Sequence, residues 1–214
     1  MEFYIHPDIK DRFFDNMRIP VQPELEGWKN VEREIGFWLN AGYDYVPIEL
    51  SLRHHPERHQ GTVTQIAREN LFLDYTRRSG SGGWLEKVKG IITDTDDAVH
   101  FPWPTAQEVD YSPLERINPL LPPDVKVIVQ PGRMFQAVWA LMGFEQFCIS
   151  LHTNYDIVQR MFETCCSLQL EVVRRALEYD CVGAVWVGDD LAFSSGLMID
   201  RKLFEKLLFP WLRR

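Results

Sequence analysis

A short apolar run that ends abruptly in two carboxylates constrains the fold of this chain more than any other feature. Residues 182–187 read Val-Gly-Ala-Val-Trp-Val, and Gly188, Asp189 and Asp190 follow directly. A continuous apolar run of this length is typical of a strand buried on both faces, as strands of parallel sheets usually are. Sites often form where such strands end, because the loops there are free of packing constraints. We therefore predict that Asp189 and Asp190 stand at the mouth of a site; the alternative is that one caps the next helix and the other is solvated.

The composition indicates a cytoplasmic globular protein. The chain has 214 residues, of which 45% are hydrophobic, so it can bury a sizeable core in one or two domains. The net charge is −8 and no Lys/Arg-rich run stands out, which argues against nucleic acid as a partner. The longest uncharged stretch, near 134–144, is too short to span a bilayer, which takes about 20 residues. The N-terminus lacks the basic and apolar regions of a signal peptide.

Strand and helix patterns alternate in the first part of the chain. Residues 18–22 are a weak candidate for a first strand because Pro20 lies within them. Apolar residues at helical spacing predict a helix over 24–41, and Gly42 suits the left-handed position that ends it. Residues 43–50 then read as a strand, with Glu49 near its carboxyl end. Strand, helix and strand in this order indicate an α/β protein.

A second strand-to-helix unit follows a long connection. Residues 125–130 predict a buried strand that ends at Gln130, and 134–147 predict a helix. The turn between them contains Gly132 and Arg133, so free N–H groups and a positive charge would meet at the start of the helix. The Lys-Ser/Thr pair of a phosphate-binding loop is absent, which makes a nucleotide a poor candidate. We expect a substrate that carries a carboxylate to bind there.

The last third of the chain predicts two more helices around the apolar run. A long amphipathic helix should begin after Thr153 or Asn154 and extend through Tyr179, and Asp200 should cap a final helix that Pro210 kinks or ends. Up to four strands, each followed by a helix, favour a doubly wound sheet or a TIM barrel. The glycine fingerprint of dinucleotide-binding folds is absent, which disfavours the first of these.

Neither the histidines nor the cysteines predict a metal site. We interpret residues 51–104 as an excursion over the barrel mouth. His54, His55 and His59 lie there in one polar, Arg-rich loop without a partner cysteine, so a solvated loop is the preferred interpretation. The four cysteines, which show no paired metal spacing, are interpreted as reduced core residues: Cys148, Cys165, Cys166 and Cys181.

The order and spacing of several segments resemble the uroporphyrinogen decarboxylase superfamily. The resemblance spans most of the chain, is densest after residue 120, and rests on these stretches: Gly132–Phe135, Leu141–Glu145, the long helix from Tyr155, Gly188-Asp-Asp-Leu191, Gly196–Ile199, and Leu203-Phe204 with Phe209-Pro210. Upstream, Gly42–Asp44 and Phe101–Pro104 are similar to the less-studied members. The resemblance implies a (β/α)8 barrel with its active site at the carboxyl ends of the strands.

The resemblance also implies one of two chemistries. One branch removes acetate carboxylates from a porphyrinogen without a cofactor, using an arginine-rich N-terminal stretch and an Asp that holds pyrrole N–H groups. Here the stretch around Arg18 lacks those arginines, and Glu49 lies near the place of the Asp without matching its register. The other branch moves methyl groups between a corrinoid protein and a thiol or another acceptor, with zinc held by His and Cys residues of later strands. Those strands are not in this chain, but the missing arginines favour methyl transfer.

Taken with the length, the resemblance predicts a single partial barrel domain over 1–214. A TIM barrel typically takes about 250 residues, and this chain supplies strands for about half of one. We expect a homodimer or a separate C-terminal half to complete it; the alternative is an inactive half-barrel that needs such a partner. The candidate catalytic residues are Asp190, Asp189 and Glu49, and the candidate substrate-binding residues are Gln130, Gly132, Arg133 and Trp186. No metal ligand is expected within the chain.

Overall fold

The computed structural model describes residues 7–17, 31–50 and 90–214, which fall into two compact units. The first unit contains Met1–Leu50, Asp110–Gln130 and Arg174–Trp186. The second contains Ser51–Val109, Pro131–Val173 and Val187–Arg214. The predicted strand over 18–22, the three loop histidines and most of the predicted excursion over 51–104 lie outside the described residues.

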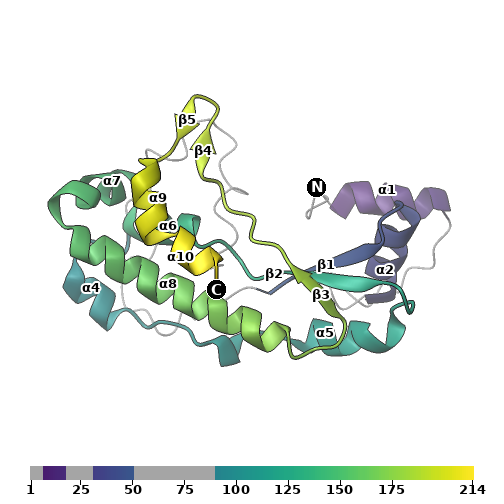
Figure 1. Ribbon diagram of the computed structural model, residues 1–214. Helices are drawn as coiled ribbons and strands as arrows, with labels where there is room; N and C mark the ends of the chain where they lie inside the picture. Colours follow the sequence, from purple (N-terminus) through teal and green to yellow (C-terminus); the bar gives the residue numbers. More distant parts are fainter. Residues whose placement is uncertain (1–6, 18–30, 51–89) are drawn as a thin grey trace. The chain divides into compact units, whose positions relative to one another are not determined.

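A parallel sheet of three strands forms the centre of the first unit (Figure 1). Its order is β1-β2-β3, with β1 at Tyr45–Glu49, β2 at Lys126–Gln130 and β3 at Val182–Val185. The strands that the sequence predicts over 43–50, 125–130 and 182–187 are thus confirmed, and so is the α/β class. Helix α2 (Val31–Asn40) packs against β1, and Gly42 follows it with φ 88°, the left-handed conformation expected of a residue that ends a helix.

Three further helical segments belong to this unit. They are α1 (Pro7–Met17), α5 (Ser112–Ile117) and the short η4 (Asn118–Leu120). The rings of Phe13 and Phe14 on α1 pack edge-to-face or tilted against Phe37 of α2, with ring centroids 5.0 and 5.8 Å apart. Leu114 and Ile117 of α5 are fully buried, so the helices share one apolar layer.

The two faces of the sheet differ in burial. On one face Val46, Ile48, Val127 and Val129 have no exposed surface, which is the packing that βα units give the helix-covered side of a parallel sheet. Side chains alternate along each strand, so the opposite face carries the remaining residues, among them Ile128, which is half-buried, and Ala184, which is exposed. One face is therefore core, and the other is incompletely covered by the described residues.

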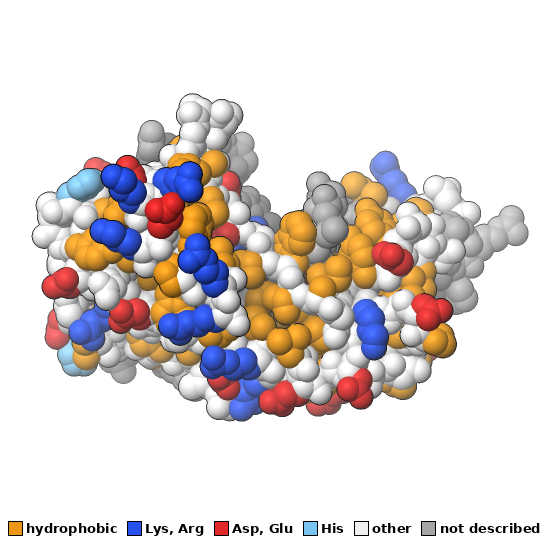
Figure 2. All heavy atoms as spheres, in the orientation of Figure 1, with side chains coloured by type: hydrophobic (Ala, Val, Ile, Leu, Met, Phe, Trp, Pro, Cys, Tyr) orange, Lys and Arg blue, Asp and Glu red, His pale blue; other side chains and the backbone are white. Residues whose placement is uncertain are grey.

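Strand β3 departs from the prediction of burial on both faces. Gly183 and Ala184 are exposed and Val182 and Val185 only half-buried, because β3 is an edge strand of the sheet that the described residues form. Figure 2 shows apolar side chains at the surface around this strand. The ladder to β2 shifts register between Val127 and Ile128, and at this irregularity a Cβ on Gly183 would lie 2.7 Å from the Cβ of Lys126. The glycine is thus required by a close approach of two strands.

The other edge strand, β1, contains a proline. Leu50 donates its N–H to the carbonyl of Gln130, so the even-numbered residues of this strand direct their backbone groups toward β2. Pro47 consequently faces away from β2, where its missing N–H disturbs no bond of the sheet. A further strand could not form a complete ladder along that edge of β1.

The second unit consists of helices and one small hairpin. Its segments are α4 (Thr95–His100), η3 (Ala106–Glu108), α6 (Phe135–Met142), α7 (Phe144–Thr153), most of α8 (Tyr155–Ala176), β4 (Ala192–Phe193), β5 (Gly196–Leu197), α9 (Arg201–Leu207) and α10 (Phe209–Leu212). Asp200 caps α9 by accepting the Lys202 N–H at 2.7 Å, as the sequence predicts. The predicted single final helix is instead two, because α9 ends at Leu207 and Pro210 lies in the first turn of α10. Strands β4 and β5 pair antiparallel, immediately after the two adjacent aspartates.

An aromatic cluster holds these helices together. The ring of Phe135 packs edge-to-face against those of Phe147 and Phe204, with centroids 5.7 and 5.0 Å apart, and all three rings are buried. The single helix predicted over 134–147 is instead two, because Gly143 adopts φ 77° between α6 and α7. That conformation is accessible to glycine and ends a right-handed helix.

The four cysteines are free thiols, as the sequence predicts. Cys165, Cys166 and Cys181 are buried, and Cys148 is half-buried. Burial raises the pKa of these thiols, which keeps them protonated and unreactive. Within the described ranges, no helix is long and apolar enough to cross a membrane.

Candidate functional site

Three predicted site residues form a row at the carboxyl edge of the sheet. Glu49 ends β1 and pairs directly with Gln130, which ends β2. Val129 pairs with Val185, and the N–H of Trp186 donates to the carbonyl of Val129 at 2.8 Å, which keeps Trp186 in register beside Gln130. Neighbouring strands lie about 4.8 Å apart and paired residues point to the same face. The side chains of Glu49, Gln130 and Trp186 therefore stand side by side on the less covered face.

The row combines a buried amide with an exposed ring. Gln130 is 6% exposed, and its Oε1 accepts no hydrogen bond from the described residues. A buried acceptor without a donor lowers stability by about 1–3 kcal/mol. The Gln130 oxygen is therefore retained either at that cost or because a group other than the described residues donates a hydrogen bond to it. Trp186 is 37% exposed although it is the largest side chain in the row. Glu49 is half-buried.

The second unit places Asp189 on the N-terminus of α6. Its Oδ2 accepts the backbone N–H groups of Met134 at 2.8 Å and Phe135 at 2.6 Å, and its Oδ1 accepts that of Gln136 at 3.0 Å. These three donors lack partners within the helix, and the helix dipole favours a negative charge there. They are the N–H groups that the sequence assigns to a substrate's carboxylate. The protein's own Asp189 takes that place.

The pKa of Asp189 is a balance of opposed effects. The effect of burial, which raises the pKa, outweighs the three backbone N–H donors and the positive charge of Arg133, which lower it, so the pKa is raised to about 6. Near neutral pH the carboxylate is mostly ionised and holds the loop that follows β3 to α6. The alternative that one of the two aspartates caps a helix thus describes Asp189, although the helix is the preceding α6 and not the next one in sequence.

Asp190 is exposed and is held by its backbone. Its N–H donates to Oε1 of Gln136 at 3.3 Å, and Gln136 in turn donates its own N–H to Asp189. Gln136 is 3% exposed, and its Nε2 lacks an acceptor among the described residues. Asp189 and Gln136 together fix the backbone of Asp190, whose side chain is exposed at the surface.

Arg133 lies on the loop that enters α6. It follows Gly132, whose φ of 116° favours glycine. Two nitrogens of its guanidinium, Nε and Nη1, are buried without an acceptor among the described residues. Its carbonyl accepts a hydrogen bond from Nε2 of Gln169, a fully buried residue of α8 whose Oε1 has no donor there. Arg133 therefore places a positive charge near Asp189, which occupies the helix N-terminus.

The predicted site residues therefore form two groups, each within one unit. Glu49, Gln130 and Trp186 belong to the first, and Gly132, Arg133, Asp189 and Asp190 to the second. Sequence reasoning missed Gln136 and Gln169. The signal was present, because each is an amide within an otherwise apolar helical face.

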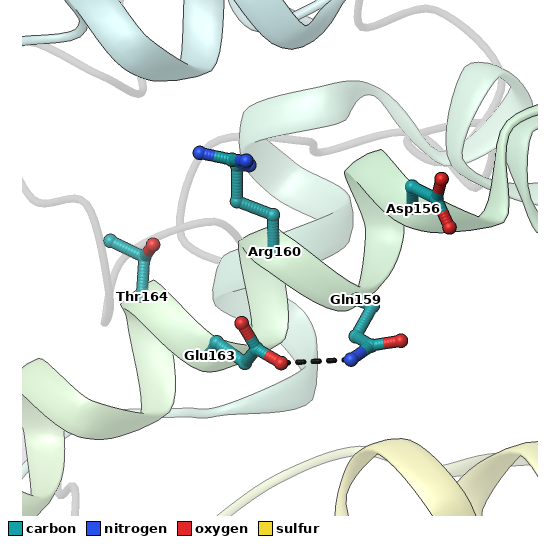
Figure 3. Close-up of a pocket in the computed structure, with 5 residues that line it drawn as sticks. All are labelled: Asp156, Gln159, Arg160, Glu163 and Thr164. Carbon is teal, nitrogen blue, oxygen red and sulfur yellow. Dashed lines mark hydrogen bonds between the residues drawn. The ribbon is translucent and has the colours of Figure 1, made fainter.

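Two other searches of the described residues reveal no further binding site. Figure 3 shows a hollow on α8 lined by Asp156, Gln159, Arg160, Glu163 and Thr164. Gln159 bonds to Glu163 one turn away at 2.9 Å, as on an ordinary solvated helix face. No group of three His, Cys, Asp or Glu side chains within the described ranges could hold a metal ion.

Comparison with known proteins supports the fold. Neither a protein-family model nor a curated protein matches the sequence. A solved structure, a methyltransferase from Methanosarcina mazei, is similar with a TM-score of 0.51 and 12% sequence identity. The similarity covers 94% of this chain and 57% of the methyltransferase. The chain thus has an α/β fold like part of a methyltransferase, and spans less than two thirds of that protein's length.

Proposed function

We propose that this chain is part of an enzyme of the uroporphyrinogen decarboxylase superfamily that transfers a methyl group to or from a corrinoid protein. The observation that carries the proposal is the row of Glu49, Gln130 and Trp186 at the carboxyl ends of parallel strands, on a fold similar to a methyltransferase. Chemistry in α/β barrels takes place at that end of the strands. The absence of the decarboxylase arginines from the N-terminal stretch favours methyl transfer over decarboxylation.

The residues take different roles in this proposal. Glu49 and Gln130 orient the methyl acceptor or donor, since both present oxygen atoms at the strand ends. In the second unit, Asp189 and Gln136 position the backbone of Asp190, and no role in the same site is assigned to that unit. The corrinoid supplies a cobalt that carries the methyl group. The described residues offer no ligand set for zinc, so a zinc-activated acceptor would require residues from elsewhere.

A direct test measures methyl transfer from methylcob(III)alamin to a small thiol, without oxygen and with Zn²⁺ in the buffer. The methyl group moves from cobalt to sulfur, cobalt keeps the electron pair as cob(I)alamin, and the thiol proton passes to solvent. We expect a rate above that without protein, and Glu49→Gln to lower it about 100-fold.

The matched control is Glu163→Gln on the solvated face of α8, which should leave the rate unchanged. A wild-type rate equal to the protein-free rate would reject methyl transfer by this chain. Release of carbon dioxide from uroporphyrinogen would support the decarboxylase instead.

A further inference from the structure

We infer that Asp189 is an internal ligand of the α6 N-terminus, and that a tetrahedral oxyanion, such as sulfate or a phosphate monoester, displaces it and binds in its place. The inference concerns the second unit alone and does not depend on the proposed reaction. Displacement would release the segment over 187–198, which contains Asp190 and the β4–β5 hairpin.

The N-terminus of α6 has more hydrogen-bond donors than Asp189 satisfies. The carboxylate accepts three backbone N–H groups, from Met134, Phe135 and Gln136. Nε2 of Gln136 is buried as well, and it has no acceptor among the described residues. The amide of Gln136 lies at this helix terminus, because its Oε1 accepts the N–H of Asp190. A ligand with more oxygen atoms than a carboxylate could also accept from this nitrogen.

Arg133 adds a positive charge and further donors. Its Nε and Nη1 are buried and lack an acceptor within the described part of the chain. The charge of Arg133 acts on the Asp189 carboxylate, so the guanidinium lies close to the same helix terminus. Helix N-termini favour phosphate and sulfate groups, and an arginine can donate to two oxygens of such a group at once. A tetrahedral oxyanion therefore offers acceptors to the backbone N–H groups, to Arg133 and to Gln136 together.

Asp189 can be displaced because its position is costly and the segment that carries it is loosely held. Burial opposes the ionised form of Asp189, and so raises the pKa of its carboxyl. Residues 192–197 are all exposed, and the hairpin projects away from the helices of the unit (Figure 1). The ring of Phe193 packs edge-to-face against that of Phe144 with centroids 6.4 Å apart. Asp189 and Asp190, whose charges would repel an anion, both lie on this segment and move away with it.

The first test titrates the chain with sodium sulfate and with methyl phosphate by calorimetry, at an ionic strength kept constant with sodium chloride. Asp189→Ala raises the fraction of molecules whose site is open, so it should bind sulfate about tenfold more tightly than wild type. Asp190→Ala removes the same charge from the exposed neighbour and should change the affinity by about twofold at most. Added to Asp189→Ala, Gln136→Leu should weaken sulfate binding about fivefold and Arg133→Met about tenfold.

The second test needs no variant and holds even if Asp189→Ala fails to fold. Hydrogen exchange of the backbone amides over 187–198 is measured on wild type in sulfate and in chloride of equal ionic strength. We expect exchange about fivefold faster in sulfate, because the displaced segment opens locally. Exchange within α8 should be the same in both salts.

The inference would be overturned if Asp189→Ala bound sulfate no more tightly than Asp190→Ala does, or if exchange over 187–198 were equal in both salts. Sulfate binding that persists unchanged with both Gln136→Leu and Arg133→Met would indicate an adventitious ion only, which also rejects it. Binding of methyl phosphate beside sulfate would assign the site to phosphate monoesters, and binding of sulfate alone would assign it to free oxyanions; either supports the inference. Methyl transfer without oxyanion binding would reject only this inference, and the reverse only the proposed reaction.

Discussion

At the scale of residues, Asp189 should set a pH dependence of stability. Burial raises its pKa to about 6, above the 3.8 of an unperturbed carboxyl. Between these values the folded state binds the proton more tightly than the unfolded chain. The contribution of protonated Asp189 to the free energy of unfolding is therefore fully present below pH ~4 and is lost as pH rises through ~6. At about 1.4 kcal/mol per pH unit, the loss is about 3 kcal/mol.

Urea unfolding from pH 4 to 7 tests this for wild-type and Asp189→Asn, because asparagine cannot ionise. The free energy of unfolding of the variant should not decline with pH. The stability advantage of wild type over the variant should therefore narrow or reverse as pH rises. Asp190→Asn, the exposed neighbour, should follow wild type. Parallel wild-type and Asp189→Asn curves would show that this carboxyl keeps an ordinary pKa.

The different environments of Asp189, which is bonded to α6, and Asp190, which is exposed, mark a limit of sequence reasoning. The apolar run followed by Asp189 and Asp190 correctly indicated that polar groups stand where a strand gives way to a loop. Which carboxylate faces α6 depends on contacts with Met134 and Phe135, 55 and 54 residues away. No local pattern carries that information. The sequence identified the anion-binding N–H groups but not the internal anion that fills them.

At the scale of elements, the irregular pairing of β3 should make the stability of the chain sensitive to substitution of Gly183. A methyl group there would meet the Lys126 Cβ at 2.7 Å, so one strand must move. We expect Gly183→Ala to cost about 1–3 kcal/mol, as overpacking usually does, seen as a lower urea midpoint with an unchanged slope. In a Lys126→Gly background, which removes the opposing Cβ, the same exchange should cost less. An equal cost in both backgrounds would assign the loss to another contact.

The sequence predicted where the strands lie better than it predicted what covers them. Apolar runs correctly predicted β1, β2 and β3, because a short apolar run favours a strand whatever covers it. The burial of β3 was predicted wrongly, since a run such as Val182–Val187 reports what the strand favours and not what covers it. The break at Gly143 was missed because the apolar spacing continues through it.

At the scale of the whole molecule, the exposed apolar strand favours association. An edge strand with an uncovered apolar face is prone to pair with another chain. Within the sheet that the described residues form, Pro47 obstructs the outer edge of β1, which leaves β3 as the edge able to extend the sheet. This chain matches 57% of the methyltransferase structure, and we propose that a second copy of this chain pairs along β3.

We therefore expect light scattering after size exclusion to give a dimer, and urea to unfold it in one transition whose midpoint rises with protein concentration. Ala184→Lys puts a charge on the exposed face of β3 and should shift the chain toward monomer, because a buried lysine would lack a partner. Gln159→Lys, the same charge change on the solvated face of α8, should leave the dimer intact. A monomer with a cooperative transition would mean that β3 is covered within the chain. A dimer unaffected by Ala184→Lys would place the interface on another surface, because the association would then not depend on the edge of the sheet.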